Sequence, residues 1–223
     1  MGDDGAMSAD LLVPARGTLA VGELEVRRSR FLTWVGRADD GDAARELIDA
    51  ARAEYPDARH HCSAYLHEVP GANRVARSSD DGEPSGTAGR PMLDVLAGSG
   101  MTDIAAVVTR YFGGVKLGTG GLVRAYSDAV AETLAEVEVH VRRERLLRAV
   151  EVGAAEAGRV EAELRSRGFD IVDTDWGARV RHLVAVDPAD LAGLDGALAA
   201  LSHGELVTTD AGRRMVETPL RRR

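Results

Sequence analysis

The chain has 223 residues, of which 44% are hydrophobic and 29% charged, and its formal net charge is −8. This composition is typical of a globular protein, and no apolar run reaches the roughly 18 residues that a membrane-spanning helix needs. Residues 1–140 have a net charge of −8 and residues 141–223 a net charge of zero, so neither part has the basic excess of a sequence-independent nucleic-acid binder. Any contact with RNA therefore requires a local basic patch.

The N-terminal residues and the cysteine content favour a cytoplasmic protein. The first ten residues are acidic and contain no apolar core, so we do not expect a signal peptide. Cys62 has no second cysteine with which to form an internal disulfide. Residues 1–16 show no periodicity and predict a loose N-terminal arm.

A mixed α+β domain is predicted over residues 17–140. Two strand-like runs come first, and helix-type spacing of apolar residues then alternates with short apolar runs. The strands are predicted over 23–26, 31–35, 60–68, 75–78 and 104–111, and the helices over 43–54, 87–97 and a segment ending near 137.

A second α+β domain is predicted over residues 141–211. Its strands are predicted over 146–152, 170–174, 178–186 and 205–209, and its helices over 154–167 and 188–201. This β-α-β-β-α-β order is typical of a ferredoxin-like fold. Residues 212–223 contain Arg213, Arg214 and a terminal arginine run. They are predicted to form a basic tail, either solvated or in contact with nucleic acid.

The most informative segment is the glycine-rich connection between the strand at 104–111 and the next helix. Glycine permits positive φ and close backbone approach, and a helix N-terminus adds free N–H groups and a positive dipole end, so this loop favours an anion. The only lysine of the chain lies within it. The alternative is a tight connection in which the glycines serve geometry alone. The candidate anion-binding residues are Arg110, Gly113, Gly114, Lys116, Gly118, Gly120, Gly121 and Arg124.

An acidic cluster, made of Asp80, Asp81, Gly82 and Glu83, precedes the helix predicted from residue 87. Clustered carboxylates can hold magnesium through their oxygens. Aspartate and glycine also build turns, and we favour the turn interpretation, with no metal site.

A second candidate anion nest follows this cluster. Thr87 and the N–H groups of Ala88 and Gly89 form it, and Arg90 lies beside it. Neither glycine-containing segment matches a Walker loop or a dinucleotide-binding motif, so no nucleotide cofactor is implied.

The run His60-His61-Cys62 is the remaining candidate for chemistry. In a strand, His60 and Cys62 face one side and His61 the other, and no second cysteine-containing pair completes a zinc site. No base or oxyanion site for a nucleophilic cysteine is visible, so we expect Cys62 to be a buried small hydrophobe. The sequence predicts no catalytic residues.

Four segments in order resemble the IMPACT family in its bacterial YigZ type: residues 28–31, 58–62, 79–93 and 110–126. Arg30 lies in the first segment and joins the candidate phosphate-binding residues. The resemblance implies an N-terminal domain similar to the second domain of ribosomal protein S5. It also implies a ferredoxin-like C-terminal domain similar to one in elongation factor G. The resemblance implies that eukaryotic relatives contact their partner protein through an additional domain, so that contact is not expected of this chain.

Two functions follow as hypotheses. The resemblance implies a link to translation, and the first hypothesis is a non-enzymatic regulator that binds RNA or the ribosome through the glycine-rich loop. The alternative is an enzyme or sensor that binds a small phosphorylated metabolite, with magnesium at Asp80 or Asp81. A protein-interaction module is a third option. No feature is specific for DNA, and no membrane contact is expected.

Overall fold

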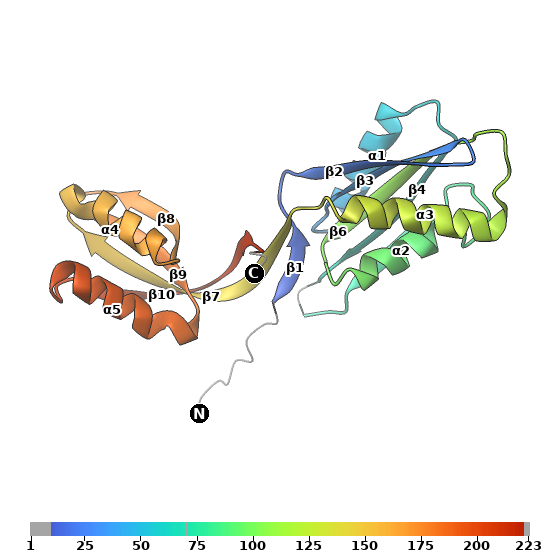
Figure 1. The fold of residues 1–223 in the computed structure, drawn as a ribbon. Helices are drawn as coiled ribbons and strands as arrows, with labels where there is room; N and C mark the ends of the chain where they lie inside the picture. The colour runs from blue at the N-terminus through green and yellow to red at the C-terminus, as the bar shows by residue number, and fades with distance from the viewer. Residues whose placement is uncertain (1–9, 70, 221–223) are drawn as a thin grey trace. The chain divides into compact units, whose positions relative to one another are not determined.

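The computed structural model describes residues 10–69 and 71–220, which divide into two compact α+β units. The first unit contains Leu11–Val141 together with the described residues from Thr218 onward, and the second contains Asp10 and Arg142–Glu217. Each unit has its own sheet and its own hydrophobic core. A mixed α+β protein with two sheets is therefore confirmed (Figure 1).

The sheet of the first unit has five strands in the order β2-β3-β6-β4-β5. All its pairings are antiparallel. The central strand β6 therefore lies between β3 and β4, and its C-terminal end leads into the glycine-rich connection. The strands are β2 (Leu19–Val26), β3 (Ser29–Arg37), β4 (His60–His67), β5 (Val75–Ser79) and β6 (Ile104–Tyr111).

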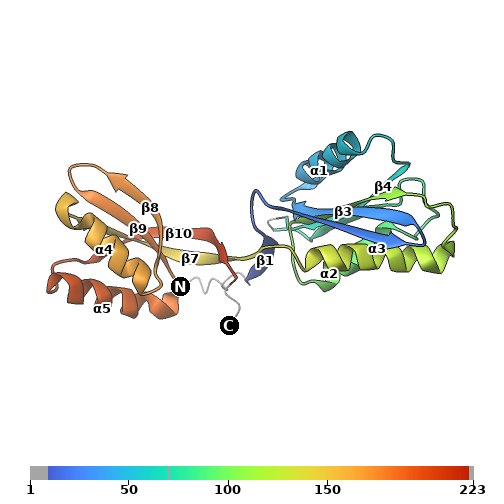
Figure 2. The same cartoon turned by 45° about the horizontal axis from the view of Figure 1, so that its top comes forward.

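Helices cover both faces of this sheet, with α1 (Gly41–Glu54) opposite α2 (Gly89–Gly98) and α3 (Gly118–Leu134) (Figure 2). Along β6, Ile104 and Ala106 belong to the main core beneath α2 and α3, whereas Ala105 packs with α1. Side chains alternate between the faces of a strand, so a strand covered on both sides is apolar throughout. This explains why 104–108 reads as one uninterrupted apolar run.

The second unit follows the predicted β-α-β-β-α-β order. Strand β7 pairs with both β9 and β10, and β9 pairs with β8. Its core is formed by α4 and α5 against β7, β8 and β9. The elements are β7 (Val139–Val152), α4 (Ala154–Ser166), β8 (Asp170–Trp176), β9 (Val180–Val186), α5 (Leu191–Ser202) and β10 (Thr208–Pro219), with a 3-10 turn at Pro188–Asp190.

The prediction of a loose arm over residues 1–16 is wrong for its C-terminal part, and residues 1–9 lie outside the described residues. Leu11–Pro14 forms strand β1, and the Leu12 carbonyl accepts a hydrogen bond from the Thr102 N–H at 2.8 Å. Val13 is fully buried. A four-residue apolar run is too short to show a periodicity, so this strand could not be predicted from the sequence.

The predicted tail over residues 212–223 also needs correction, and its terminal run at 221–223 lies outside the described residues. Strand β10 extends to Pro219, so Arg213 and Arg214 belong to a strand that pairs with β7. This segment contains few apolar residues, so its sequence does not show the alternation of polar and apolar residues that predicts a strand. Among the described residues, no helix has both the length and the apolar character that crossing a membrane requires.

Candidate functional site

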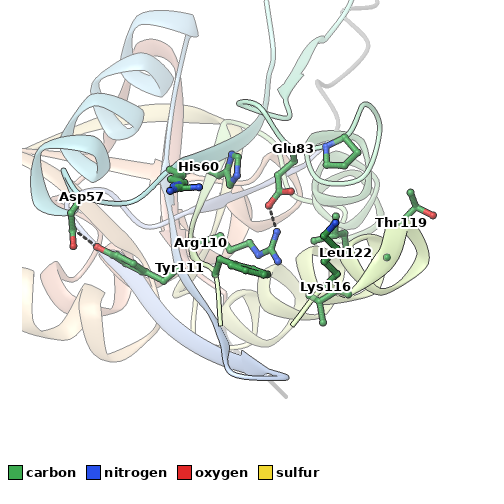
Figure 3. Close-up of a pocket in the computed structure, with 13 residues that line it drawn as sticks. Asp57, His60, Glu83, Arg110, Tyr111, Lys116, Thr119 and Leu122 are labelled. Atoms are coloured by element: carbon green, nitrogen blue, oxygen red, sulfur yellow. Dashed lines mark hydrogen bonds and ion pairs between the residues drawn. The ribbon is translucent and has the colours of Figure 1, made fainter. Parts of the chain in front are cut away.

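A cavity of about 650 Å³ lies in the first unit where the glycine-rich connection leaves the sheet (Figure 3). Four stretches of chain form its walls: the segment entering β4, the acidic cluster, the C-terminal end of β6 with the residues after it, and the first turns of α3. The lining residues are Asp57, Arg59, His60, Glu83, Pro84, Arg110, Tyr111, Phe112, Lys116, Leu117, Gly118, Thr119 and Leu122.

The glycine loop serves geometry at Gly113. A Cβ atom at this position would overlap the backbone of Arg28 and Ser29, so the β6–α3 connection passes directly against the β2–β3 turn. The Gly113 N–H donates to Ser29 Oγ at 3.1 Å and is therefore not available to a ligand. At this position the glycine therefore serves the geometry of a tight connection, as the alternative interpretation of the loop expects.

The anion-binding interpretation is supported at the start of α3. Gly118 has φ of +73° and opens the helix, and the N-cap residue Leu117 provides no side-chain hydrogen bond. The first N–H groups of a helix have no partner within the helix, and the dipole makes this end positive. The cavity is lined by Lys116, Gly118 and Thr119, so the lysine and the helix N-terminus both lie at its wall.

A buried ion pair forms another wall of the cavity. Arg110 Nη1 lies 2.6 Å from Glu83 Oε1, and the two side chains are 8% and 4% exposed. The Tyr126 hydroxyl donates to the same oxygen at 2.8 Å. Burial raises the pKa of Tyr126. Glu83 thus closes a turn through its backbone N–H, which donates to the Asp80 carbonyl at 2.9 Å, and its side chain is half of an ion pair. Sequence reasoning missed the ion pair because the partner lies 27 residues away.

The guanidinium of Arg110 lies near two aromatic rings. Its Cζ is 5.5 Å from the ring centre of Phe31 and 5.7 Å from that of Phe112, as in cation–π contacts. Its Nε is buried and has no hydrogen-bond partner. Phe112 is 57% exposed although it lines the cavity. An exposed ring at a cavity mouth is a surface on which a planar ligand can stack.

The second anion nest is already filled by the protein itself. Asp80 Oδ1 accepts the N–H groups of Ala88 at 3.0 Å and Gly89 at 2.9 Å, and its Oδ2 accepts that of Gly86. Burial alone raises the pKa of Asp80, but these three donors outweigh it and hold the pKa below its ordinary value. The Thr87 hydroxyl donates to the Pro84 carbonyl at 2.7 Å. The prediction that Thr87 and Gly89 bind an external phosphate is therefore wrong, because their donors are engaged within the protein.

The acidic cluster builds a turn rather than a magnesium site. Asp81 Oδ2 accepts the N–H of His61 at 2.6 Å, and its Oδ1 pairs with Arg52 at 3.0 Å. Asp81 and Gly82 both have positive φ, as a tight turn requires. Among the described residues no group of three or more His, Cys, Asp or Glu side chains is arranged to hold a metal ion.

Several predicted site residues do not line this cavity. Arg30 pairs with Glu23 and Arg90 with Asp94, all four at the surface. Arg124 is exposed on α3 and is not among the lining residues. Gly114, Gly120 and Gly121 lie in the loop or the first helical turn without lining the cavity. The motif predicted the right segment of chain but not which of its residues line the cavity, because successive residues of a helix point in different directions.

The arginines of the second unit are mostly engaged by carboxylates. Arg143 and Arg145 both pair with Asp187, and Arg213 pairs with Glu144. The positive charge of these arginines is therefore offset by neighbouring carboxylates.

Cys62 is fully buried beneath α2 and α3, as predicted. Burial raises the pKa of its thiol to about 12, so the reactive thiolate is not formed near neutral pH. Its Sγ lies 3.3 Å from the Tyr126 hydroxyl.

Fold and site together define a two-unit α+β protein with a ligand-sized cavity beside a glycine-rich strand-to-helix connection. Residues 27–134 match the family model of the Impact N-terminal domain, and residues 151–205 match a domain of unknown function, DUF1949. The chain is 39% identical over 195 residues to the IMPACT family member YigZ of Escherichia coli, covering 87% of this chain and 95% of that protein. The chain belongs to the IMPACT family.

Two further proteins are similar over most of the chain. The IMPACT family member YvyE of Bacillus subtilis is 36% identical, with 82% of this chain and 83% of that protein covered. A crystal structure of a hypothetical protein is 37% identical, with a TM-score of 0.57, and the match covers 90% of this chain and 97% of that one.

Proposed function

We propose that the first unit binds single-stranded RNA through the cavity and thereby acts in translation as a non-enzymatic regulator. The observation that carries the proposal is the meeting of Lys116, the uncapped N-terminus of α3 and the exposed ring of Phe112 around one cavity. A cation, free backbone donors and an aromatic platform are the elements with which proteins hold single strands.

The phosphate is assigned to the Lys116 side of the cavity. Backbone N–H groups at a helix start bind phosphate oxygens directly, and a nearby ammonium adds charge. Lys116 has no acidic partner among the described residues, whereas most exposed arginines of the first unit do have one. It therefore offers positive charge that the protein has not already neutralised.

The base is assigned to Phe112. Stacking of a base on an aromatic ring contributes about 1–3 kcal/mol and tolerates any sequence. A duplex keeps its bases stacked on one another, so this contact favours single strands, loops and ends.

The fold supports a link to translation by analogy. The order and pairing of β7, α4, β8, β9, α5 and β10 fit the proposed ferredoxin-like fold, and the first unit is proposed to be a variant of the second domain of ribosomal protein S5. Analogy of fold alone is weak support for function, so the proposal depends on the site.

The test measures binding of a fluorescent 12-nucleotide RNA at several salt concentrations. Lys116→Ala should weaken binding and lower the slope of log affinity against log salt by about 0.7, which corresponds to one phosphate on a single strand. Phe112→Ala should weaken binding about tenfold with an unchanged slope. The matched control is Arg45→Ala, which removes an exposed cation of α1 outside the cavity.

A small phosphorylated ligand is the second candidate, because the cavity volume lies within the range of small-molecule pockets. Mononucleotides that displace the RNA at equal concentration would favour this candidate. Absence of RNA binding at low salt, or equal loss in the Arg45→Ala control, would contradict the RNA proposal. Magnesium is no longer part of this alternative, because Asp80 and Asp81 are occupied by protein donors.

A further inference from the structure

We infer that the cavity recognises the ribose of an RNA nucleotide through its 2′-hydroxyl, with His60 Nε2 as the acceptor. This inference rests on the proposed function and adds selection of RNA over DNA.

The tautomer of His60 is set by its partner. His60 Nδ1 lies 2.8 Å from the backbone carbonyl oxygen of Asp81, and a carbonyl oxygen only accepts hydrogen bonds. In a neutral imidazole Nδ1 therefore carries the proton, and Nε2 carries a lone pair. Asp81 itself is fixed by Arg52 and by the His61 N–H, so the ring orientation is held by a rigid turn. No described residue donates to Nε2.

Glu83 adds a second acceptor to this wall. Both of its hydrogen bonds, from Arg110 and from Tyr126, go to Oε1. Among the described residues Oε2 therefore receives no donor. His60 and Glu83 line the same cavity (Figure 3). The imidazole lone pair and the unpartnered carboxylate oxygen both accept hydrogen bonds, so they favour a donor group on the ligand.

The cavity consequently has two sides of opposite preference. Lys116 and the α3 N-terminus favour an anion, whereas His60 Nε2 and Glu83 Oε2 offer acceptors to a hydrogen-bond donor. Arg59 and Arg110 also line the cavity, and the charge of Arg110 is offset by Glu83. A ribonucleotide presents this combination, because its 2′-hydroxyl donates a hydrogen bond a few ångströms from its phosphate. Recognition of a ribose hydroxyl by an acidic side chain is also how dinucleotide-binding folds hold ribose. The 2′-hydroxyl is the group that distinguishes RNA from DNA.

The experiment compares three 12-nucleotide strands of one sequence: RNA, 2′-fluoro RNA and DNA. The fluorine keeps the sugar conformation of RNA but cannot donate a hydrogen bond. At pH 8, where an imidazole is neutral, RNA should bind the unmodified protein about tenfold more tightly than either other strand, as expected for one well-placed hydrogen bond. His60→Ala should bind all three strands alike while keeping the salt slope of the unmodified protein.

The control is His140→Ala, which removes a histidine outside the cavity and should keep the tenfold preference. Equal binding of RNA and 2′-fluoro RNA by the unmodified protein would overturn the inference and leave the proposed function standing. Binding of none of the strands would instead overturn the proposed function. A preference that survives in a folded His60→Ala variant would overturn the assignment to His60.

Discussion

At the scale of single residues, the most instructive side chain is Asp80. Three N–H groups point at one place before α2, as the sequence predicts for an anion nest, but the anion is the carboxylate of Asp80 itself. A pattern of small residues before a helix shows that an anion is favoured there. It does not show whether the anion comes from a ligand or from the same chain.

The substitution Asp80→Asn should destabilise the protein in a pH-dependent way. Hydrogen bonds to a charged acceptor are stronger than neutral ones, so we expect a loss of about 2 kcal/mol in the free energy of unfolding at pH 7. The pKa of Asp80 is lowered in the folded state. Its contribution is therefore complete above the unfolded value of about 3.9 and is lost as the pH falls through the lower folded value.

Urea denaturation from pH 7 down to pH 2.5 checks this expectation, with Asp94→Asn as the control. Asp94 is exposed and pairs with Arg90 within one helix, a kind of ion pair that contributes about 0.5 kcal/mol at most. A difference between Asp80→Asn and the unmodified protein that stays constant from pH 7 to pH 2.5 would refute the assigned role.

At the scale of elements, the connection from β6 to α3 combines a structural and a functional role. The sequence predicted both the strand over 104–111 and a helix after the glycines, because apolar runs and helical spacing are local signals. It did not reveal that Gly113 lies against the turn between β2 and β3. That contact joins residues 84 positions apart and leaves no local pattern.

Replacement of Gly113 by alanine should therefore be costly. The new Cβ would overlap backbone atoms of Arg28 and Ser29, which cannot rotate away as a side chain could. We expect a loss of about 3 kcal/mol in the free energy of unfolding, measured by chemical denaturation. Gly120→Ala is the matched control: its Cβ would enter open space in the first turn of α3, and alanine should be neutral or stabilise by up to about 1 kcal/mol. Similar losses in both variants would show that the loop is generally intolerant and that no specific close approach exists.

At the scale of the whole molecule, the sequence predicted the two α+β regions and most of their elements but not the partners that define the site. The Arg110–Glu83–Tyr126 network joins β6, the acidic cluster and α3, and each member reads locally as something else. Arg110 suggested a phosphate contact and Glu83 a turn, yet they neutralise each other. Among the described residues, Lys116 is the one predicted phosphate-binding cation that lines the cavity and has no acidic partner.

The division into two units leads to a final prediction about a fragment spanning residues 10–141. All residues that line the cavity lie between 57 and 122. The main core of the first unit contains residues up to and including Val139 and none after it. The fragment loses the hydrogen bond from the Leu220 N–H to the Val139 carbonyl, which lies at the edge of this unit. It should therefore unfold in a single cooperative transition and bind the 12-nucleotide RNA within about threefold of the full chain.

Circular dichroism during heating measures the unfolding transition, and fluorescence anisotropy measures the RNA affinity. A tenfold loss of affinity in a folded fragment would mean that the second unit supplies RNA contacts in spite of its paired arginines, and a transition without cooperativity would mean that the first unit does not fold alone.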